Sequence, residues 1–389
     1  MTHYTQPDFF ALDELFDDDQ RLIRQTVRRF VDDRVMPGIA QHARAGTFPL
    51  DIVPEMGRLG MFGANLEGHG CADLGAIAYG LINQELERGD SGVRSFVSVQ
   101  SSLCMWPIHT FGTEEQKERW LPAMARGEKV GCFGLTEAES GSDPGSMKTT
   151  ARRDGGDYVL NGAKMWITNG SIADVAIVWA KLDGAVRGFL VEKGMRGFSA
   201  PQIHNKFSLR ASVTSELVFE DVRVPLENLL PGSEIGLRAA LECLNQARYS
   251  IVWGAVGAAS ACYDEALRYA RERRQFDRPI ARFQLVQQKL VWMITEITKA
   301  QLLAFRLGRL KESGKAKHYH VSMGKLNNVS VALKCARLAR EILGAAGIID
   351  DYQCSRHLCN LESVYTYEGT HDIHTLVVGE AVTGERALY

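Results

Sequence analysis

The stretch Thr366-Tyr367-Glu368-Gly369-Thr370 places one carboxylate between an aromatic ring and a glycine, just before a predicted helix start at Thr370 or Asp372. A carboxyl group packed against a large ring loses solvation, and its pKa rises toward the range in which it accepts a proton from a weak carbon acid. Gly369 has no Cβ, so a substrate can approach the backbone closely. Taken alone, the motif favours a surface glutamate near a helix N-terminus. The rest of the chain must decide between the two interpretations.

The length indicates a folded protein of two or three packed units, because 389 residues exceed the number that one typical hydrophobic core accommodates. The formal net charge of −2 gives no overall attraction to nucleic acid or to an acidic membrane, so neither is expected as a partner. No apolar run approaches ~18 residues, and no membrane span is expected.

The eight cysteines form no CxxC pair, and several, such as Cys132, lie in apolar contexts. This pattern favours free buried thiols over disulfides and therefore a reducing compartment. The N-terminus carries no charged-then-apolar export signal, which predicts a cytoplasmic protein.

The first third of the chain reads as helical, from about residue 18 to residue 126. Acidic N-cap candidates at 17–19 precede apolar residues at helical spacing. Further helices are predicted over 52–59, 76–88 and 114–125.

The sequence pattern changes from helical spacing to short strand-like runs near Val130. Short strand-like runs follow at 175–180, 188–191 and 216–219, and Asn161-Gly162 within 158–167 predicts a hairpin turn. We expect a small antiparallel β-domain from about Cys132 to Pro231. Long amphipathic helices are predicted from about Gly236 onward. The predicted units are 1–131, 132–235 and 236–389, in an α+β fold.

Four separated segments carry a family likeness. They are Phe133-Gly134-Leu135-Thr136-Glu137 with Gly141-Ser142-Asp143, then Lys164-Met165-Trp166-Ile167-Thr168-Asn169, Arg273-Arg274-Gln275-Phe276 with Gln284, and Tyr367-Glu368-Gly369-Thr370. Through them the chain resembles the acyl-CoA dehydrogenases along essentially its full length. The resemblance implies an N-terminal α-helical domain, a central antiparallel β-domain, a C-terminal four-helix bundle, an FAD cofactor and a homotetramer.

Within the family, residues 85–95, 98–103 and 366–374 are similar to the glutaryl-CoA dehydrogenase branch. Two departures stand out. Val93 occupies a position where an aromatic residue is common, and residues 343–347 replace a more glycine-rich turn that contacts the flavin.

The resemblance implies that Glu368 removes the α proton of an acyl thioester while the β hydrogen leaves as hydride to the flavin. The Glu368 N–H and a ribityl hydroxyl would polarise the thioester carbonyl, a form of oxyanion stabilisation. The alternative is a structural carboxylate at a helix end.

Arg94 would select the substrate, since a buried guanidinium can hold the distal carboxylate of a dicarboxylic thioester such as glutaryl-CoA. The alternative is an internal ion pair with Glu87 or Asp90. In the resembled branch, Glu87 and Tyr367 accompany decarboxylation, although Glu87 could instead pair with Arg88 or Arg94.

The other expected substrate contacts are Ser95, Ser98, Ser142, Leu241, Leu244, Asn245, Arg248 and Gly369. Asn245 would bond the pantetheine arm and Arg248 a CoA phosphate. An ordinary helix interior is the alternative for Leu241 and Leu244.

Two groups of residues are expected to bind FAD. The first comprises Phe133, Leu135, Thr136, Ser142, Trp166, Ile167 and Thr168, with core packing as an alternative or additional role for Trp166. The second comprises Arg273, Phe276, Gln284, Glu341, Leu343, Gly344, Ala345, Thr370 and Asp372. In this group Arg273, Phe276 and Gln284 would reach the FAD of a neighbouring subunit, and Thr370 and Asp372 would lie near that same FAD. A solvated helix face is the alternative for the basic cluster that includes Arg273.

His371 and His374 are three residues apart, but no further ligand completes a metal site, and none is expected. The chain has no GxGxxG after a strand and no GxSxG elbow. The predicted function is FAD-dependent oxidation and decarboxylation of glutaryl-CoA to crotonyl-CoA, with electrons passed to an electron-transfer flavoprotein. The alternatives are a short-chain acyl-CoA dehydrogenase or oxidase, and a non-catalytic acyl-thioester-binding flavoprotein.

Overall fold

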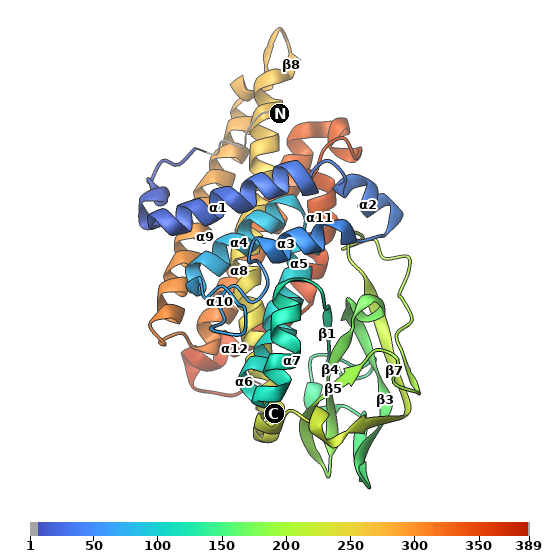
Figure 1. Cartoon of the computed structure of the whole chain (residues 1–389). Helices are drawn as coiled ribbons and strands as arrows, with labels where there is room; N and C mark the ends of the chain where they lie inside the picture. Colours follow the sequence, from blue (N-terminus) through green and yellow to red (C-terminus); the bar gives the residue numbers. More distant parts are fainter. Residues whose placement is uncertain (1–6, 388–389) are drawn as a thin grey trace.

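The computed structural model describes residues 7–387, in which helices are followed by a sheet and then by helices again (Figure 1). The N-terminal helices are α1 (Asp18–Phe30), α2 (Ile39–Ala45), α3 (Val53–Arg58), α4 (Gly75–Gly89), α5 (Ser91–Ser98), α6 (Trp106–Phe111) and α7 (Glu114–Ala125). A π-helical segment, η4 (Val99–Met105), joins α5 to α6.

Side-chain caps start two of the helices that the sequence predicts, α1 and α7. Asp17 Oδ1 accepts a bond from the Gln20 N–H at 2.8 Å, and the Asp17 N–H donates to Gln20 Oε1, which forms a capping box. Thr113 and Gln116 repeat this arrangement at the start of α7.

The middle of the chain forms one curled sheet in the order β1-β4-β2-β3-β7-β6, with β5 also paired to β4. Its strands are β1 (Gly131–Gly134), β2 (Thr150–Asp154), β3 (Asp157–Thr168), β4 (Val175–Leu182), β5 (Ala185–Glu192), β6 (Phe198–Ser199) and β7 (Thr214–Pro225). Most pairings are antiparallel, but β4 runs parallel to β1 and to β2. The expectation of a purely antiparallel sheet therefore missed the crossover connections that parallel pairs require.

The predicted hairpin turn at Asn161-Gly162 is wrong, because both residues lie inside the continuous strand β3. Asn161 bonds Asp221 of β7 in both directions, at 2.9 and 3.0 Å, and the pairing is irregular there. The turn instead falls at Gly155-Gly156, between the paired residues Asp154 and Asp157.

The C-terminal part contains three long helices, two shorter ones and a small hairpin. They are α8 (Leu237–Glu272), β8 (Arg274–Gln275), β9 (Arg278–Pro279), α9 (Gln284–Glu312), α10 (His318–Leu343), α11 (Cys354–Thr366) and α12 (His371–Thr383). Helix α8 runs through the middle of the molecule, and the β8–β9 hairpin projects at the end away from the sheet (Figure 1). The helical bundle and the sheet together confirm the predicted fold class.

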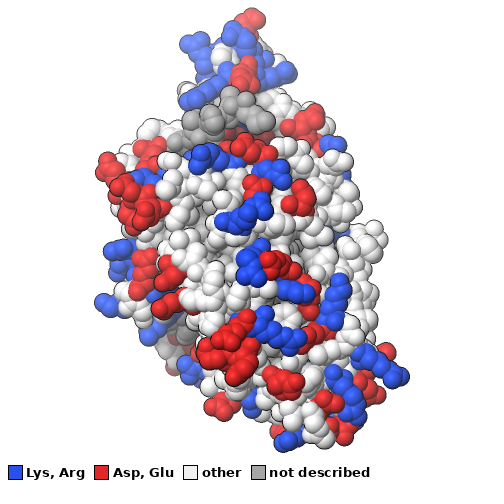
Figure 2. Space-filling view, in the orientation of Figure 1, with Lys and Arg blue, Asp and Glu red and all other residues white. Residues whose placement is uncertain are grey.

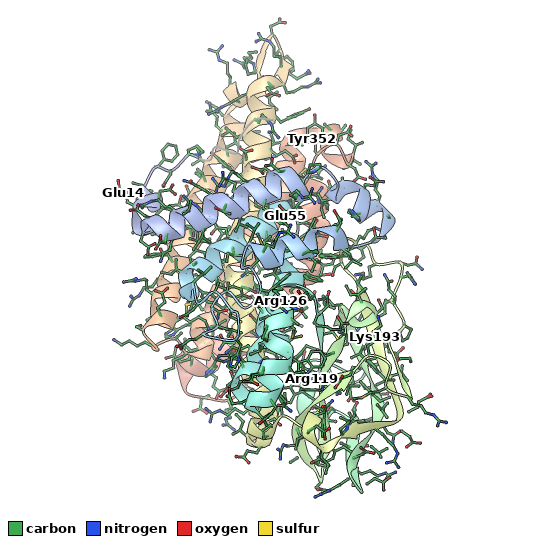
Figure 3. All side chains as sticks on the ribbon, in the orientation of Figure 1. Glu14, Glu55, Arg119, Arg126, Lys193 and Tyr352 are labelled. Atoms are coloured by element: carbon green, nitrogen blue, oxygen red, sulfur yellow. The ribbon has the colours of Figure 1, made fainter. Side chains whose placement is uncertain are left out.

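Ion pairs connect the layers at their edges. Arg119 extends from α7 toward the sheet, where its Nη2 lies 2.6 Å from Glu192 Oε2 at the end of β5 (Figure 3). On the face seen in Figure 2, acidic and basic side chains alternate, except that Lys and Arg gather at the projecting hairpin.

All eight cysteines are free thiols, and six of them are buried. Burial raises the pKa of the Cys132 thiol to about 12. Within the described residues, no helix is both long enough and apolar enough to cross a membrane.

Candidate active site

The loop of residues 367–369 joins the end of α11 to the start of α12. Thr370 caps α12, its Oγ1 accepting a bond from the Ile373 N–H at 3.2 Å. Glu368 has φ 52° and Gly369 φ 93°, both in the left-handed region. A non-glycine residue rarely adopts this conformation, and such strain persists only where surrounding contacts impose it.

Two basic side chains impose this conformation through the loop's carbonyl groups. Lys325 of α10 donates from Nζ to the Tyr367 carbonyl and to the Gly369 carbonyl, the latter at 2.7 Å. Arg248 of α8 donates from Nε to the Glu368 carbonyl at 2.6 Å. Three successive carbonyl oxygens of the loop are thus held by two cations from two helices.

The Glu368 carboxylate sits in a low-solvent environment. Burial raises its pKa, against the opposing charges of Arg94, Lys325 and Arg248. Glu368 Oε2 is buried and has no hydrogen-bond partner among the described residues. This is not the surface carboxylate of the alternative interpretation, and the arrangement suits a group that exchanges a proton with a ligand.

Arg94 lies on α5 with its side chain completely buried. Its Nε is 2.6 Å from Glu87 Oε2, and its Nη2 donates to the Tyr367 hydroxyl. The predicted alternative of an internal ion pair with Glu87 is therefore present. The remaining nitrogen, Nη1, is buried without a partner among residues 7–387.

Two other ion pairs were considered, Arg94 with Asp90 and Glu87 with Arg88, but Asp90 and Arg88 have different partners. Asp90 accepts bonds from Arg356 at 3.0 Å and from Asn360 at 2.9 Å. Arg88 pairs with Glu85 and Asp32.

Gly254 of α8 makes room for the Glu87 carboxylate. A Cβ at this position would lie 1.9 Å from Glu87 Oε2 and 3.2 Å from Arg94 Nε. The Arg94–Glu87 ion pair therefore requires a glycine at position 254 of α8.

The other predicted substrate contacts lie on α5 and on the first turns of α8. Ser95 and Ser98 are buried, and Ser98 Oγ is 2.7 Å from Ser250 Oγ. Four residues on one face of α8 are exposed or half-buried: Leu241, Leu244, Asn245 and Arg248. Leu241 is exposed, so an ordinary helix interior does not describe it. Arg248 also donates from Nη1 to Asn245 Oδ1 at 3.3 Å.

The first predicted flavin group gathers on the sheet. Phe133, Leu135 and Ile167 are buried, Thr136 and Thr168 are half-buried, and Ser142 is exposed. Trp166 is 61% exposed, with φ 64° at an irregularity between β3 and β7. Core packing of Trp166 is therefore wrong. Trp166 lies two residues before Thr168 on β3, and its neighbour Met165 is bonded to the Thr136 carbonyl. An exposed indole with half-buried threonines on the same segments fits a flat, polar-edged ring system such as a flavin.

A buried ion pair holds these segments together. Lys164 Nζ lies 2.8 Å from Glu137 Oε1, and Glu137 also accepts bonds from the Lys148 and Thr149 N–H groups. Met165 N–H donates to the Thr136 carbonyl at 2.8 Å. The loop after β1 is thereby fixed against β3.

Much of the second predicted flavin group lies at the opposite end of the molecule. Arg273, Phe276 and Gln284 are exposed around the β8–β9 hairpin, and Phe276 is 86% exposed. Glu341 pairs with Lys289 of α9 at 2.8 Å, and the turn after α10 contains buried Leu343 and exposed Gly344 and Ala345. The structure does not bring this end together with Trp166 in one protomer. Thr370 and Asp372 instead lie at the start of α12, next to Glu368.

Two side chains beside Glu368 were missed from the sequence. Lys325 is 2% exposed, and His374 is buried with Nδ1 3.0 Å from Ser322 Oγ. The helical spacing of Val321, Lys325 and Val329 places Lys325 on the buried face of α10, which is a signal that it needs a partner. Nothing comparable marks His374. The described residues contain no cluster of three or more His, Cys, Asp or Glu side chains able to hold a metal ion.

Comparison with known proteins agrees with this architecture. Residues 17–128, 132–222 and 234–383 match the N-terminal, middle and C-terminal domains of acyl-CoA dehydrogenases. The short-chain specific acyl-CoA dehydrogenase of Clostridium acetobutylicum is 35% identical over 92% of this chain and 97% of its own length.

Solved structures of a glutaryl-CoA dehydrogenase from Mycobacterium smegmatis are more similar. One is 53% identical with a TM-score of 0.97, covering 98% of this chain and 99% of the other. Another, in complex with FADH2, is 51% identical with a TM-score of 0.96, covering 98% of both chains. With all three domains matched in order, the chain belongs to the acyl-CoA dehydrogenase family of FAD-dependent enzymes.

Proposed function

We propose that this enzyme oxidises a short dicarboxylic acyl-CoA, glutaryl-CoA in particular, and decarboxylates the product to crotonyl-CoA. The observation that carries the choice of substrate is the buried Arg94, whose Nη1 has no hydrogen-bond partner in the described part of the chain. An unpaired guanidinium nitrogen in a buried site is costly, and a ligand carboxylate satisfies it.

Glu368 acts as the base in this proposal. Its carboxylate accepts the α proton of the thioester, and bound FAD supplies the acceptor for the β hydrogen. The Glu368 N–H donates to the thioester carbonyl oxygen and stabilises the negative charge that develops there. The raised pKa of Glu368 brings the strength of the base closer to that of its target.

Decarboxylation follows oxidation and needs no further cofactor. The bond from the γ carbon to the carboxylate breaks, CO₂ leaves, and the electron pair spreads into the enone. Glu368, which holds the proton taken in the first step, returns it to give crotonyl-CoA. In this scheme Arg94 contacts the departing carboxylate, and Glu87 and Tyr367, which are bonded to Arg94, lie around it.

The substrate is further contacted by the α5 serines, by Ser142, by Gly369 and by the exposed face of α8. Phe133, Leu135, Thr136, Trp166, Ile167 and Thr168 hold the flavin of their own protomer. Because Thr370 and Asp372 follow Glu368 at the start of α12, we assign them to this same flavin rather than to that of a neighbouring subunit. The residues around the β8–β9 hairpin and the α10 end contact the FAD of a neighbouring subunit in a homotetramer. We assign three domains, residues 1–131, 132–235 and 236–389. An electron-transfer flavoprotein is the proposed electron acceptor. Because the cysteines are free thiols, which are typical of a reducing compartment, we propose a cytoplasmic location.

Anaerobic mixing of the FAD-loaded enzyme with glutaryl-CoA and butyryl-CoA tests the proposal. Bleaching of the flavin and release of CO₂ with glutaryl-CoA support it. Faster bleaching with butyryl-CoA would instead indicate a short-chain acyl-CoA dehydrogenase. Peroxide release in air would identify an oxidase, and no bleaching with any acyl-CoA would indicate a binding protein.

A further inference from the structure

The ammonium group of Lys325 contacts the loop that carries Glu368. Its Nζ bonds the carbonyls on both sides of Glu368, those of Tyr367 and Gly369. It also lies 5.7 Å from the centre of the Tyr367 ring. Lys325 therefore contacts the residue before Glu368 and the residue after it.

These bonds determine where the Glu368 N–H points. The described residues contain no cis peptide bond, so each carbonyl in the loop points opposite to the N–H of the same peptide group. Because the Tyr367 carbonyl faces Lys325, the N–H of Glu368 faces away from it. Arg248 holds the next carbonyl, that of Glu368 itself.

Packing alone does not explain a lysine at this position. Lys325 sits on the buried face of α10 between Val321 and Val329, where an apolar residue would avoid the cost of desolvating an ammonium group. Burial lowers the pKa of Lys325 to about 7, although the nearby Glu368 opposes this effect. The left-handed conformation of Glu368 is a second cost at the same place.

We propose that Lys325 is a positioning residue for the dehydrogenation, which turns the Tyr367–Glu368 peptide so that the Glu368 N–H meets the thioester carbonyl oxygen. The inference rests on the proposed function, because it assigns that N–H to an acyl thioester.

A second consequence concerns charge. The groups that face Glu368 are Arg94 from α5, Glu87 from α4, Arg248 from α8, Lys325 from α10 and His374 from α12. Lys325 and the two arginines favour the ionised carboxylate, and Glu87 opposes it. Burial lowers the pKa of His374 to about 3, so its ring is neutral near pH 7. Loss of the Lys325 charge therefore raises the pKa of Glu368.

The first test compares two ligands that differ only in the carbonyl oxygen. Glutaryl-CoA and its thioether analogue, S-(4-carboxybutyl)-CoA, are titrated into FAD-loaded Glu368→Gln enzyme, in which turnover is blocked. We expect the thioester to bind about tenfold more tightly, the value of one hydrogen bond. Adding Lys325→Met should remove most of this preference, and Lys325→Arg, which keeps the donors, should retain it. An unchanged preference in the Met variant would overturn the proposal.

The second test uses otherwise wild-type enzyme and the pH profile of kcat/KM. Lys325→Gln keeps an N–H donor but removes the charge, so the acid limb should move up by about one pH unit. This variant also provides the test if Lys325→Met does not fold. Lys311→Met is the matched control, because Lys311 is a half-buried lysine of the same bundle that donates to Gln246 rather than to the loop. An acid limb that stays in place in Lys325→Gln, or moves equally in Lys311→Met, would contradict the role of the charge.

The outcomes separate this inference from the proposed function. If wild-type enzyme fails to reduce its flavin with any acyl-CoA, the function is wrong. If it reduces the flavin normally but Lys325→Met keeps the thioester preference, only the role of Lys325 is wrong.

Discussion

Arg94 Nε donates to Glu87 Oε2 at 2.6 Å in a completely buried ion pair, and yet Arg94 Nη1 has no hydrogen-bond partner within the described residues. Glu87 Oε1 is satisfied by Ser91 Oγ at 2.8 Å. Desolvation makes such a pair a weak source of stability. Its orientation, with one nitrogen left over, is what recognition of a second carboxylate requires.

Replacing Arg94 by Gln should lower kcat/KM for glutaryl-CoA roughly 10- to 100-fold more than for butyryl-CoA, which is the value of a charge-assisted hydrogen bond. The substitution leaves Glu87 buried and unpaired, so the double variant Arg94→Gln/Glu87→Gln serves as the control for folding. Steady-state kinetics with both substrates provide the measurement. An unchanged ratio would remove Arg94 from substrate selection.

Gly254→Ala should disturb the same pair from the opposite helix. The new Cβ would lie 1.9 Å from Glu87 Oε2, so the carboxylate must move. We expect a loss of about 1–3 kcal/mol in stability and a weaker preference for glutaryl-CoA. Gly379→Ala is the matched control in α12, because a Cβ there would meet no described atom within 4 Å outside its chain neighbours and its own helix backbone. Equal melting temperatures for the two variants would contradict the contact.

Trp166→Ala should weaken FAD binding without unfolding the chain. The side chain is 61% exposed, so its removal costs little packing in the absence of the flavin. Loss of a stacked ring should speed FAD release about tenfold. Flavin fluorescence after dilution measures the release, and FAD retention equal to that of the wild type would rule out the contact.

Glu137→Gln should destabilise the enzyme in a pH-dependent way. Burial favours the neutral form of Glu137, but bonds from Lys148, Lys164 and Thr149 outweigh it and lower the pKa to about 2. The carboxylate therefore contributes stability above its ordinary pKa of 4.5, and this contribution is lost as the pH falls toward about 2.

Melting temperatures across this range provide the measurement for Glu137. The wild type should exceed the Gln variant at pH 6, and the gap should shrink below about pH 4.5. Glu139→Gln is the control, because the Glu139 side chain is exposed. A gap that stays constant with pH would contradict the assignment.

The sequence predicts the order helices, sheet, helices, because capping residues and hydrophobic spacing are local signals. Asp17 caps α1 as expected, and α7 spans the predicted residues 114–125. Asn161-Gly162 misleads because a pairing partner on β7, Asp221, satisfies the Asn side chain inside a strand. No local pattern reveals such a partner 60 residues away.

The candidate site shows the same division. Glu368 and Arg94 belong to recognisable motifs, and the structure brings them to one place with Tyr367 between them. Lys325 and Gly254 have no motif, since their significance comes from the helix that packs opposite them.

The most direct test of the account is the rate at which glutaryl-CoA reduces the bound flavin in Glu368→Gln enzyme under anaerobic conditions. Glu362 is an exposed residue on α11, so the Glu362→Gln variant is the control, and its flavin should be reduced at the wild-type rate. We predict that Glu368→Gln binds FAD and glutaryl-CoA but shows no flavin reduction on the timescale of turnover. Flavin reduction at a near-normal rate in this variant would show that another group removes the proton and would contradict the account.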